Sequence, residues 1–265
     1  MTELFTPAAL TALAVCTGAA AATVLGSFMV LRGSHSNPRL LAFGLAFSGG
    51  AMVYVSLIEI FVKSLSAFGE VYDEKAAYTA ATLSFFAGVG LLALIDRLVP
   101  NPHAGMDADH PQFEQERIKR VGLLAAAAIT AHNFPEGLAT FFATLDNPVV
   151  GAPLALAIAI HNIPEGVSIA IPVYYATGSK GKAVGASAIS AMAEPVGAVI
   201  GYLLLAPFLS PPVFGAVFGI IAGVMVFLAL DELMPEAKRY SKGHEAPYGM
   251  VIGMAAMALS LVLFK

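Results

Sequence analysis

The chain has 265 residues, 58% of them apolar and 12% charged, with no tryptophan, a mean hydropathy of +0.78 and a formal net charge of −4. Because an average soluble domain has about 25% charged residues, this composition excludes an ordinary soluble domain and indicates a membrane protein with several spans. The one cysteine, Cys16, excludes an internal disulfide framework and a cysteine-cluster metal site. We interpret it as a small apolar residue of the first span.

Eight apolar runs are each long enough to cross a bilayer as a helix, which takes about 20 residues. They predict spans at residues 7–31, 40–62, 77–99, 121–142, 149–175, 183–205, 213–234 and 247–264. Glu3 stands where the basic start of a signal peptide would be, so the first run is expected to remain as a span. Short Gly, Pro and polar segments such as 146–148 and 210–212 separate the runs. The one sizeable loop is 100–120, so residues 1–265 are predicted to form a single transmembrane domain.

The distribution of Lys and Arg predicts the orientation, since cytoplasmic loops carry an excess of both. Loops that follow the odd-numbered spans hold eleven of these residues, and the other side holds only Lys63, Lys75 and Lys265. Both termini are therefore predicted to lie outside the cytoplasm. An even number of spans agrees with this orientation.

A six-residue motif occurs twice, 29 residues apart, inside the fourth and fifth runs. Its copies are His132-Asn133-Phe134-Pro135-Glu136-Gly137 and His161-Asn162-Ile163-Pro164-Glu165-Gly166. On a helix, residues i and i+4 share a face, so the His and Glu of each copy point the same way. Each proline removes a backbone donor and frees a carbonyl four residues back, and each glycine lets another helix approach closely.

Two imidazoles, two carboxylates and two amide oxygens form a ligand set that suits zinc, iron, nickel or copper, and the carboxylates extend it toward manganese. Glu194, beside Pro195 in the sixth run, is a further candidate ligand. Each carboxylate would cost about 2.5–3.5 kcal/mol at this depth if charged and unpaired, so cations or protons must neutralise it. A single buried His–Glu pair is more often a structural hydrogen bond. The duplication, together with Glu194, favours a metal site.

Eight spans, external termini, a histidine-containing loop after the third span and the paired motif together resemble the ZIP family of metal-ion transporters. The resemblance covers essentially the whole chain, and the short loop is most similar to the bacterial branch of the family. It implies an all-α integral membrane fold with eight transmembrane helices in a three-two-three arrangement. It also implies a two-metal site between the fourth and fifth spans, and import of divalent ions across the inner (cytoplasmic) membrane of a bacterium.

Carried over position by position, the resemblance assigns a primary metal site to His132, Glu136, His161 and Glu165. A neighbouring site shares the two motif carboxylates as bridges and adds Asn133, Asn162 and Glu194. In the second span the family often supplies a thioether, here Met52, for which core packing is the alternative. Glu59 lies seven residues further on the same face of an otherwise apolar run, where a ligand near the outer end of the path would sit.

The sequence therefore predicts a transporter and not an enzyme, with Zn²⁺ as the imported ion and Fe²⁺, Mn²⁺, Co²⁺ and Cd²⁺ as further candidates. Transport is expected to use alternating access, with the ion as substrate and no other cofactor. The expected partners are the ion and the lipid bilayer, not nucleic acid, and a homodimer is left open. One alternative is an intramembrane metalloenzyme, although the His-Glu-x-x-His motif and a separate base are absent. The other is a metal-binding membrane protein without transport, for which the loops are too short to form a signalling domain.

Overall fold

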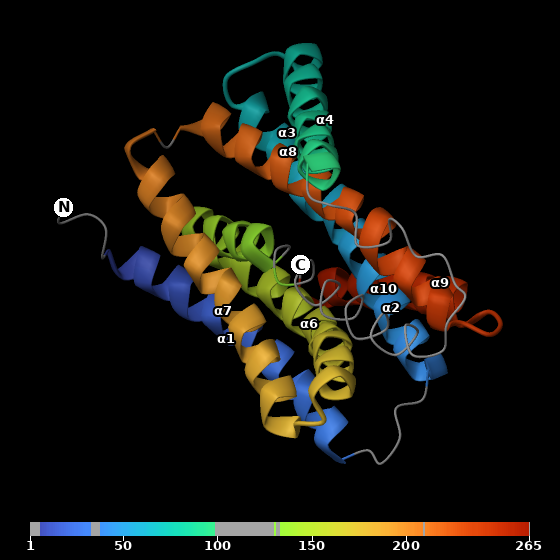
Figure 1. The fold of residues 1–265 in the computed structure, drawn as a ribbon. Helices are drawn as coiled ribbons and strands as arrows, with labels where there is room; N and C mark the ends of the chain where they lie inside the picture. Colours follow the sequence, from blue (N-terminus) through green and yellow to red (C-terminus); the bar gives the residue numbers. More distant parts are fainter. Residues whose placement is uncertain (1–5, 33–37, 99–129, 131–132, 209, 265) are drawn as a thin grey trace.

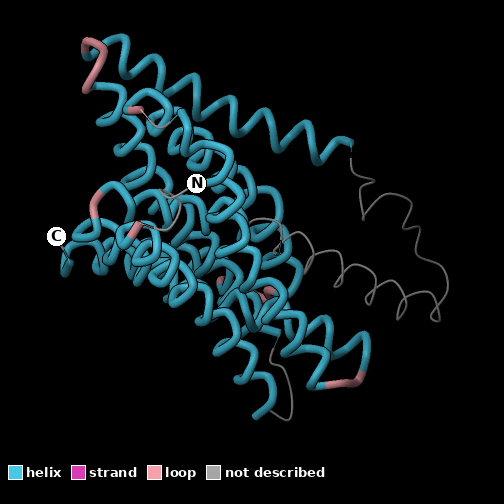
Figure 2. The backbone as a smooth tube through the Cα atoms, turned by 90° about the vertical axis from the view of Figure 1, so that its left-hand side faces the viewer, coloured by secondary structure: helices cyan, strands magenta, loops and turns pink. Residues whose placement is uncertain are grey.

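The computed structural model describes residues 6–32, 38–98, 130, 133–208 and 210–264. Within these ranges the chain is almost entirely helical and has no strand, which confirms the all-α class. Figure 2 shows the helices running broadly alongside one another. The predicted loop 100–120 lies outside the described residues, and so does half of the fourth predicted span.

The helices have the following bounds (Figure 1): α1 (Pro7–Arg32), α2 (Pro38–Val55), α3 (Phe61–Gly69), α4 (Glu74–Leu98), α6 (Pro148–Thr177), α7 (Lys180–Leu205), α8 (Pro211–Leu228), α9 (Met234–Tyr240) and α10 (Glu245–Phe264). Residues 133–146 are also helical. A π-helical segment, Ser56–Ile60, joins α2 to α3, and a second one, Ala229–Leu233, joins α8 to α9. A short 3-10 turn, Ala206–Phe208, follows α7.

Seven helices of the described part are long and apolar enough to cross a membrane. They correspond to seven of the eight predicted spans. Two extend well beyond their predicted ends, because the second reaches Gly69 and the seventh reaches Tyr240. Lys63 and Glu236 end the apolar runs in the sequence, but both residue types favour helix, so the backbone continues past them.

The polar segment 146–148, which is predicted to separate two spans, contains the start of α6. The Asn147 side chain accepts a hydrogen bond from the Val149 N–H at 3.0 Å and caps α6, whose first residue is Pro148. The same helix ends at Gly178, which has a φ of 65° and donates its N–H to the Tyr174 carbonyl. These two ends fix the length of the helix that carries the second copy of the motif.

The helices form two groups, visible as two sets of ribbons in Figure 1. In the first, which we call the motif bundle, α1 packs against α6 and α7, and residues 133–146 pack against α7. In the second, the apolar bundle, α2 packs against α10 and α9, and α8 packs against α3 and α4. Contacts of α6 with α2 and α10 join the two bundles.

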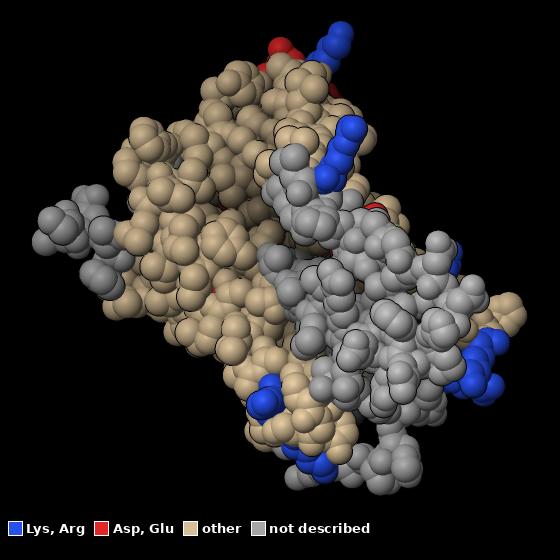
Figure 3. Space-filling view, viewed as in Figure 1, with Lys and Arg blue, Asp and Glu red and all other residues tan. Residues whose placement is uncertain are grey.

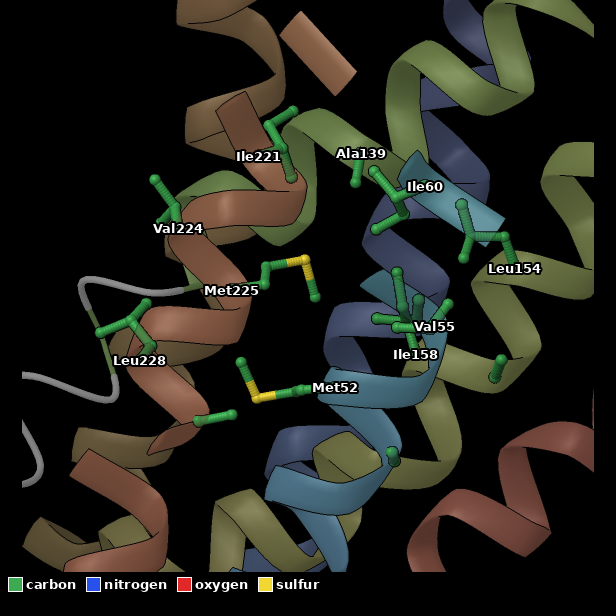
Figure 4. Packing of buried hydrophobic residues seen from close by; sticks show 14 of the residues in the cluster. Met52, Val55, Ile60, Ala139, Leu154, Ile158, Ile221, Val224, Met225 and Leu228 are labelled. Atoms are coloured by element: carbon green, nitrogen blue, oxygen red, sulfur yellow. The ribbon is translucent and has the colours of Figure 1, made fainter. Parts of the chain in front are cut away.

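An apolar core fills the space between the bundles, as Figure 4 shows. Met52 from α2 and Met225 from α8 extend into the space between their two helices and are fully buried. Ile158 of α6 contributes from the motif bundle. This core positions α6, and therefore the second copy of the motif, against the apolar bundle.

Large apolar side chains also lie on the outside of the molecule. On α4, Leu83, Phe86, Leu91 and Leu94 are all at least half exposed. Figure 3 shows that acidic and basic side chains occupy only a few places on the face in view, and that most of its described surface is uncharged. Such a surface is suited to contact with lipid rather than with water.

Candidate metal site

Three of the predicted ligands meet in the interior of the motif bundle. Glu136 comes from the helix 133–146, whereas His161 and Glu165 lie one turn apart on α6. One ligand atom from each residue lies within 4.8 Å of the others, and the three side chains are at most 1% exposed. The i and i+4 spacing thus places the His and Glu of the second copy on one face, and helix packing brings the first copy's Glu to them.

The ring of His161 has an acceptor next to each nitrogen. Its Nε2 lies 3.0 Å from Glu136 Oε1, and its Nδ1 lies 3.3 Å from the Ala157 carbonyl oxygen. A neutral imidazole has only one N–H, so it can satisfy only one of these acceptors. The other contact therefore needs a second proton, on the ring or on the Glu136 carboxyl, or a metal ion. A proton on Nδ1 and a metal ion at Nε2 satisfy both contacts, and this is the usual form of a metal-bound histidine.

The amide groups of the two motif asparagines are oriented by their hydrogen bonds. Asn162 Nδ2 donates to the Ala19 carbonyl at 3.1 Å and to Glu194 Oε1 at 2.7 Å. Asn133 Nδ2 donates to the Ser190 carbonyl at 3.2 Å and to the Ser190 hydroxyl at 3.1 Å. Because backbone carbonyls only accept, these contacts decide which amide atom is nitrogen.

The opposite amide atoms are buried oxygens. Neither Asn133 Oδ1 nor Asn162 Oδ1 has a hydrogen-bond partner among the described residues, and both side chains are fully buried. Buried polar atoms almost always have a partner, so each orphan needs an explanation. A bound cation would supply a partner to both.

Glu194 of α7 brings a third carboxylate to this region. It is fully buried, and its Oε2 has no hydrogen-bond partner within the described part of the chain. Its approach depends on Gly137, since a Cβ at that position would overlap the Glu194 carbonyl oxygen. On the other motif helix, a Cβ at Gly166 would overlap the carbonyl oxygen of Thr23 in α1. Both motif glycines therefore permit close helix contact, as the sequence predicts.

Three serines that the sequence analysis did not single out contact the motif helices. Besides Ser190, the Ser48 hydroxyl donates to the His161 carbonyl and the Ser187 hydroxyl donates to the Gly166 carbonyl, each at 3.1 Å. Serine is common in membrane helices and carries little signal by itself. Ser187, Ser190 and Glu194 recur at helical spacing on one face of α7, and that spacing was the available clue.

The remaining predicted residues lie elsewhere. Met52 is fully buried in the apolar core beside Met225 (Figure 4), and Glu59 lies in the π-helical segment after α2. Glu59 does not belong to the buried group of Glu136, His161 and Glu165. His132 lies outside the described residues, so its ligand role stays a prediction.

The charges of the buried group favour a divalent cation. Glu136, Glu165 and Glu194 bring carboxylates into one interior with a single described imidazole. Apart from the half-buried Lys63, every Lys and Arg whose side chain the structure describes is exposed. A buried carboxylate needs a charge partner, and here protons or a metal ion must provide it. Imidazole, carboxylate and amide oxygen are all ligands that zinc accepts.

Comparison with known proteins gives a consistent result. The family described as ZIP Zinc transporter matches residues 100–261. The chain is 65% identical to the zinc transporter ZupT of Neisseria meningitidis over 245 residues, which cover 91% of each protein. It is 63% identical to the protein of the same name from Xanthomonas axonopodis pv. citri, over 96% of this chain and 94% of the relative. With the Streptococcus mutans protein of that name it shares 45% identity, over 99% and 98% of the two chains.

Proposed function

Because this chain belongs to the ZIP family of zinc transporters, we propose that it imports Zn²⁺ through the buried site of the motif bundle. The family's activity is transport and not catalysis, as the sequence predicts. The observation that carries the proposal is the buried group of Glu136, His161 and Glu165, whose ligand atoms lie within 4.8 Å of one another. A purely structural hydrogen bond to His161 would need only one carboxylate. The group buries two, which favours a bound cation.

In the proposed primary site, Glu136, His161 and Glu165 bind the ion together with His132. In the proposed second site, the same two carboxylates bridge to the amide oxygens of Asn133 and Asn162 and to Glu194. The orphaned amide oxygens and Glu194 Oε2 support this assignment. Since the ligands combine nitrogen and oxygen, Fe²⁺, Mn²⁺, Co²⁺ and Cd²⁺ are further proposed substrates.

The burial of the proposed ligands supports alternating access. The side chains of those that the structure describes are at most 1% exposed, so an ion should reach them only when the surrounding helices move. Deprotonated ligands bind the ion, and protons compete with it, so acid conditions are expected to weaken binding. Uptake is therefore expected to fall as the external pH falls.

The direction of transport and the placement in the membrane also belong to the proposal. Eleven Lys and Arg follow the odd-numbered spans and three lie on the other side, which supports external termini and a bacterial cytoplasmic membrane. The three-two-three arrangement, the eighth span and the single-domain organisation stay predictions. A homodimer likewise stays a prediction.

The direct test is uptake of radiolabelled Zn²⁺ into proteoliposomes that contain the wild type, Glu136→Ala or Glu165→Ala. We expect saturable uptake by the wild type and none above background by either variant. Glu70→Ala, at an exposed position after α3, is the matched control and should transport normally. Unchanged uptake in both motif variants would reduce the motif to a packing element. Tight Zn²⁺ binding without uptake by the wild type would instead support a metal-binding protein that does not transport.

A further inference from the structure

A partly buried ion pair joins the π-helical segment Ser56–Ile60 to the first turn of α3. Lys63 Nζ is 3.9 Å from Glu59 Oε1, and their side chains are 14% and 8% exposed. The other Lys and Arg side chains that the structure describes are exposed. Removing an ammonium from water is costly, so a half-buried lysine needs a reason beyond surface charge.

Two further features occur close to Glu59 in the sequence, namely a π-helical backbone and a buried hydroxyl group. Glu59 lies within the π-helical segment Ser56–Ile60, and such segments in long helices are frequent at functional sites. The Ser56 hydroxyl, three residues before Glu59, is fully buried and has no hydrogen-bond partner among the described residues. The segment thus contains a carboxylate that is paired with a tethered cation and a buried hydroxyl oxygen without a described partner.

This position lies between the buried metal site and the outer side of the membrane. Ser48 contacts the His161 carbonyl and therefore marks the level of the site on α2. Glu59 follows eleven residues later, which on a helix corresponds to about 16 Å. Its neighbour Ile60 faces the core beside Ala139 and Leu154 (Figure 4). The Lys and Arg distribution places the Glu59 end of this span outside the cytoplasm.

We propose that Lys63 is a tethered competitor for the ion at an outer binding position formed by Glu59 and Ser56. Between transport events the ammonium of Lys63 occupies the Glu59 carboxylate, and an arriving Zn²⁺ displaces it. This inference rests on the proposed function as a zinc importer. Coulomb attraction scales with charge, so a divalent ion is attracted to the carboxylate about twice as strongly as the ammonium is. A monovalent ion has no such advantage, and Lys63 therefore selects for divalent ions.

The test is the external KM for Zn²⁺ uptake in proteoliposomes of uniform orientation. Lys63→Gln removes the competitor, so KM should fall roughly two- to fivefold, the range that a partly exposed ion pair supports, while the maximal rate is retained. Lys75→Gln removes one exposed positive charge near the same end of the molecule and should leave KM unchanged. If the Gln variant does not purify as a folded protein, Lys63→Met, which keeps the aliphatic stem, takes its place.

Two further arms separate competition from a purely structural ion pair. Glu59→Gln should raise KM, and adding Lys63→Gln to it should have no additional effect, because the competitor has lost its target. Replacing external choline by K⁺ at constant ionic strength should raise the KM of Lys63→Gln but not that of the wild type. A KM for Lys63→Gln that is unchanged or higher would overturn the role of Lys63. Absence of saturable uptake by the wild type would overturn the proposed function and this inference with it.

Discussion

The centre of the motif bundle contains polar side chains, whereas the space between α2 and α8 in the apolar bundle contains apolar ones. The motif bundle buries three carboxylates, an imidazole and two amides, namely Asn133, Glu136, His161, Asn162, Glu165 and Glu194. Between α2 and α8, the apolar bundle instead buries Met52, Met225 and their aliphatic neighbours (Figure 4). Met52 and Met225 are as fully buried as the polar side chains of the motif bundle, so burial alone does not make a site. The difference lies in whether the buried atoms require a partner that the protein does not supply.

Both bundles nevertheless use the same packing device. In the motif bundle, Gly137 lies directly against the backbone of Glu194, and in the apolar bundle Gly223 lies against the carbonyl of Phe85. Small residues allow such close approach between membrane helices. In one bundle the close contact brings a carboxylate to the site, whereas in the other it only joins α8 to α4. Variants at matched positions can therefore separate binding from packing.

The largest effect is expected from the two motif carboxylates. Glu136→Gln and Glu165→Gln keep the shape of the side chain but remove its charge, so Zn²⁺ should no longer bind. For the wild type, Zn²⁺ at a hundredfold excess over Kd should raise the free energy of unfolding by about 2.7 kcal/mol. Thermal unfolding in detergent, with and without Zn²⁺, measures this gain, which both variants should lose. Stabilisation by Zn²⁺ that survives in both would place the site outside the motif bundle.

The matched glycines come next. Alanine at Gly137 or Gly223 adds a methyl group against backbone, so each should lower the free energy of unfolding by about 1–3 kcal/mol or more. Only Gly137→Ala displaces Glu194, and only this variant should weaken Zn²⁺ binding, by about tenfold or more. Calorimetric titration with Zn²⁺ distinguishes the two. Equal loss of affinity in both variants would mean that general loosening, and not the position of Glu194, controls binding.

A smaller effect is expected from hydroxyl groups. Ser190→Ala removes one of the two acceptors that orient Asn133, so Zn²⁺ affinity should fall by about tenfold, the lower end of the range for residues that support a ligand. Ser64→Ala in the apolar bundle removes a hydrogen bond to the Gly215 carbonyl. Each substitution should cost about 1 kcal/mol of stability. Equilibrium dialysis should show normal affinity for the Ser64 variant, and a normal value for Ser190→Ala would argue against oriented amides.

The smallest effect is expected from Met52→Leu. The substitution conserves volume in an apolar core, so stability should change by less than about 1.5 kcal/mol. If the thioether only packs, the rate of Zn²⁺ uptake should stay close to that of the wild type. A loss as large as that of Glu136→Gln would make Met52 a ligand, as the family resemblance suggests. That result would also mean that the apolar bundle takes part in metal binding and does not serve packing alone.

The motif and the spans could be predicted from the sequence because both depend on local patterns. The i and i+4 spacing of His161 and Glu165 predicts a shared face, and Asn147-Pro148 predicts the start of α6. The pairing of Glu136 with His161 requires two helices to meet, and the repeated motif made that contact predictable as well. Each of these predictions rests on chemistry or helix geometry that a short stretch of sequence displays.

Other features had no local signal. The π-helical segments at Ser56–Ile60 and Ala229–Leu233 depend on how α2 and α8 pack, and no local sequence pattern predicts them. The role of Ser190 depends on which asparagine lies opposite, which the position of α7 decides. The division into two bundles likewise follows from long-range packing. Lys63 is an exception, because its i and i+4 spacing from Glu59 is visible in the sequence.

Zinc K-edge X-ray absorption on the purified, zinc-loaded protein tests the central claim most directly. The account predicts nitrogen and oxygen neighbours at about 2.0–2.2 Å, with the outer-shell scattering of imidazole. That imidazole signal should decrease in His161→Ala, and bound zinc should be lost in the double variant Glu136→Gln/Glu165→Gln. Zinc bound by oxygen alone, with a spectrum that none of these substitutions alters, would contradict a metal site in the motif bundle.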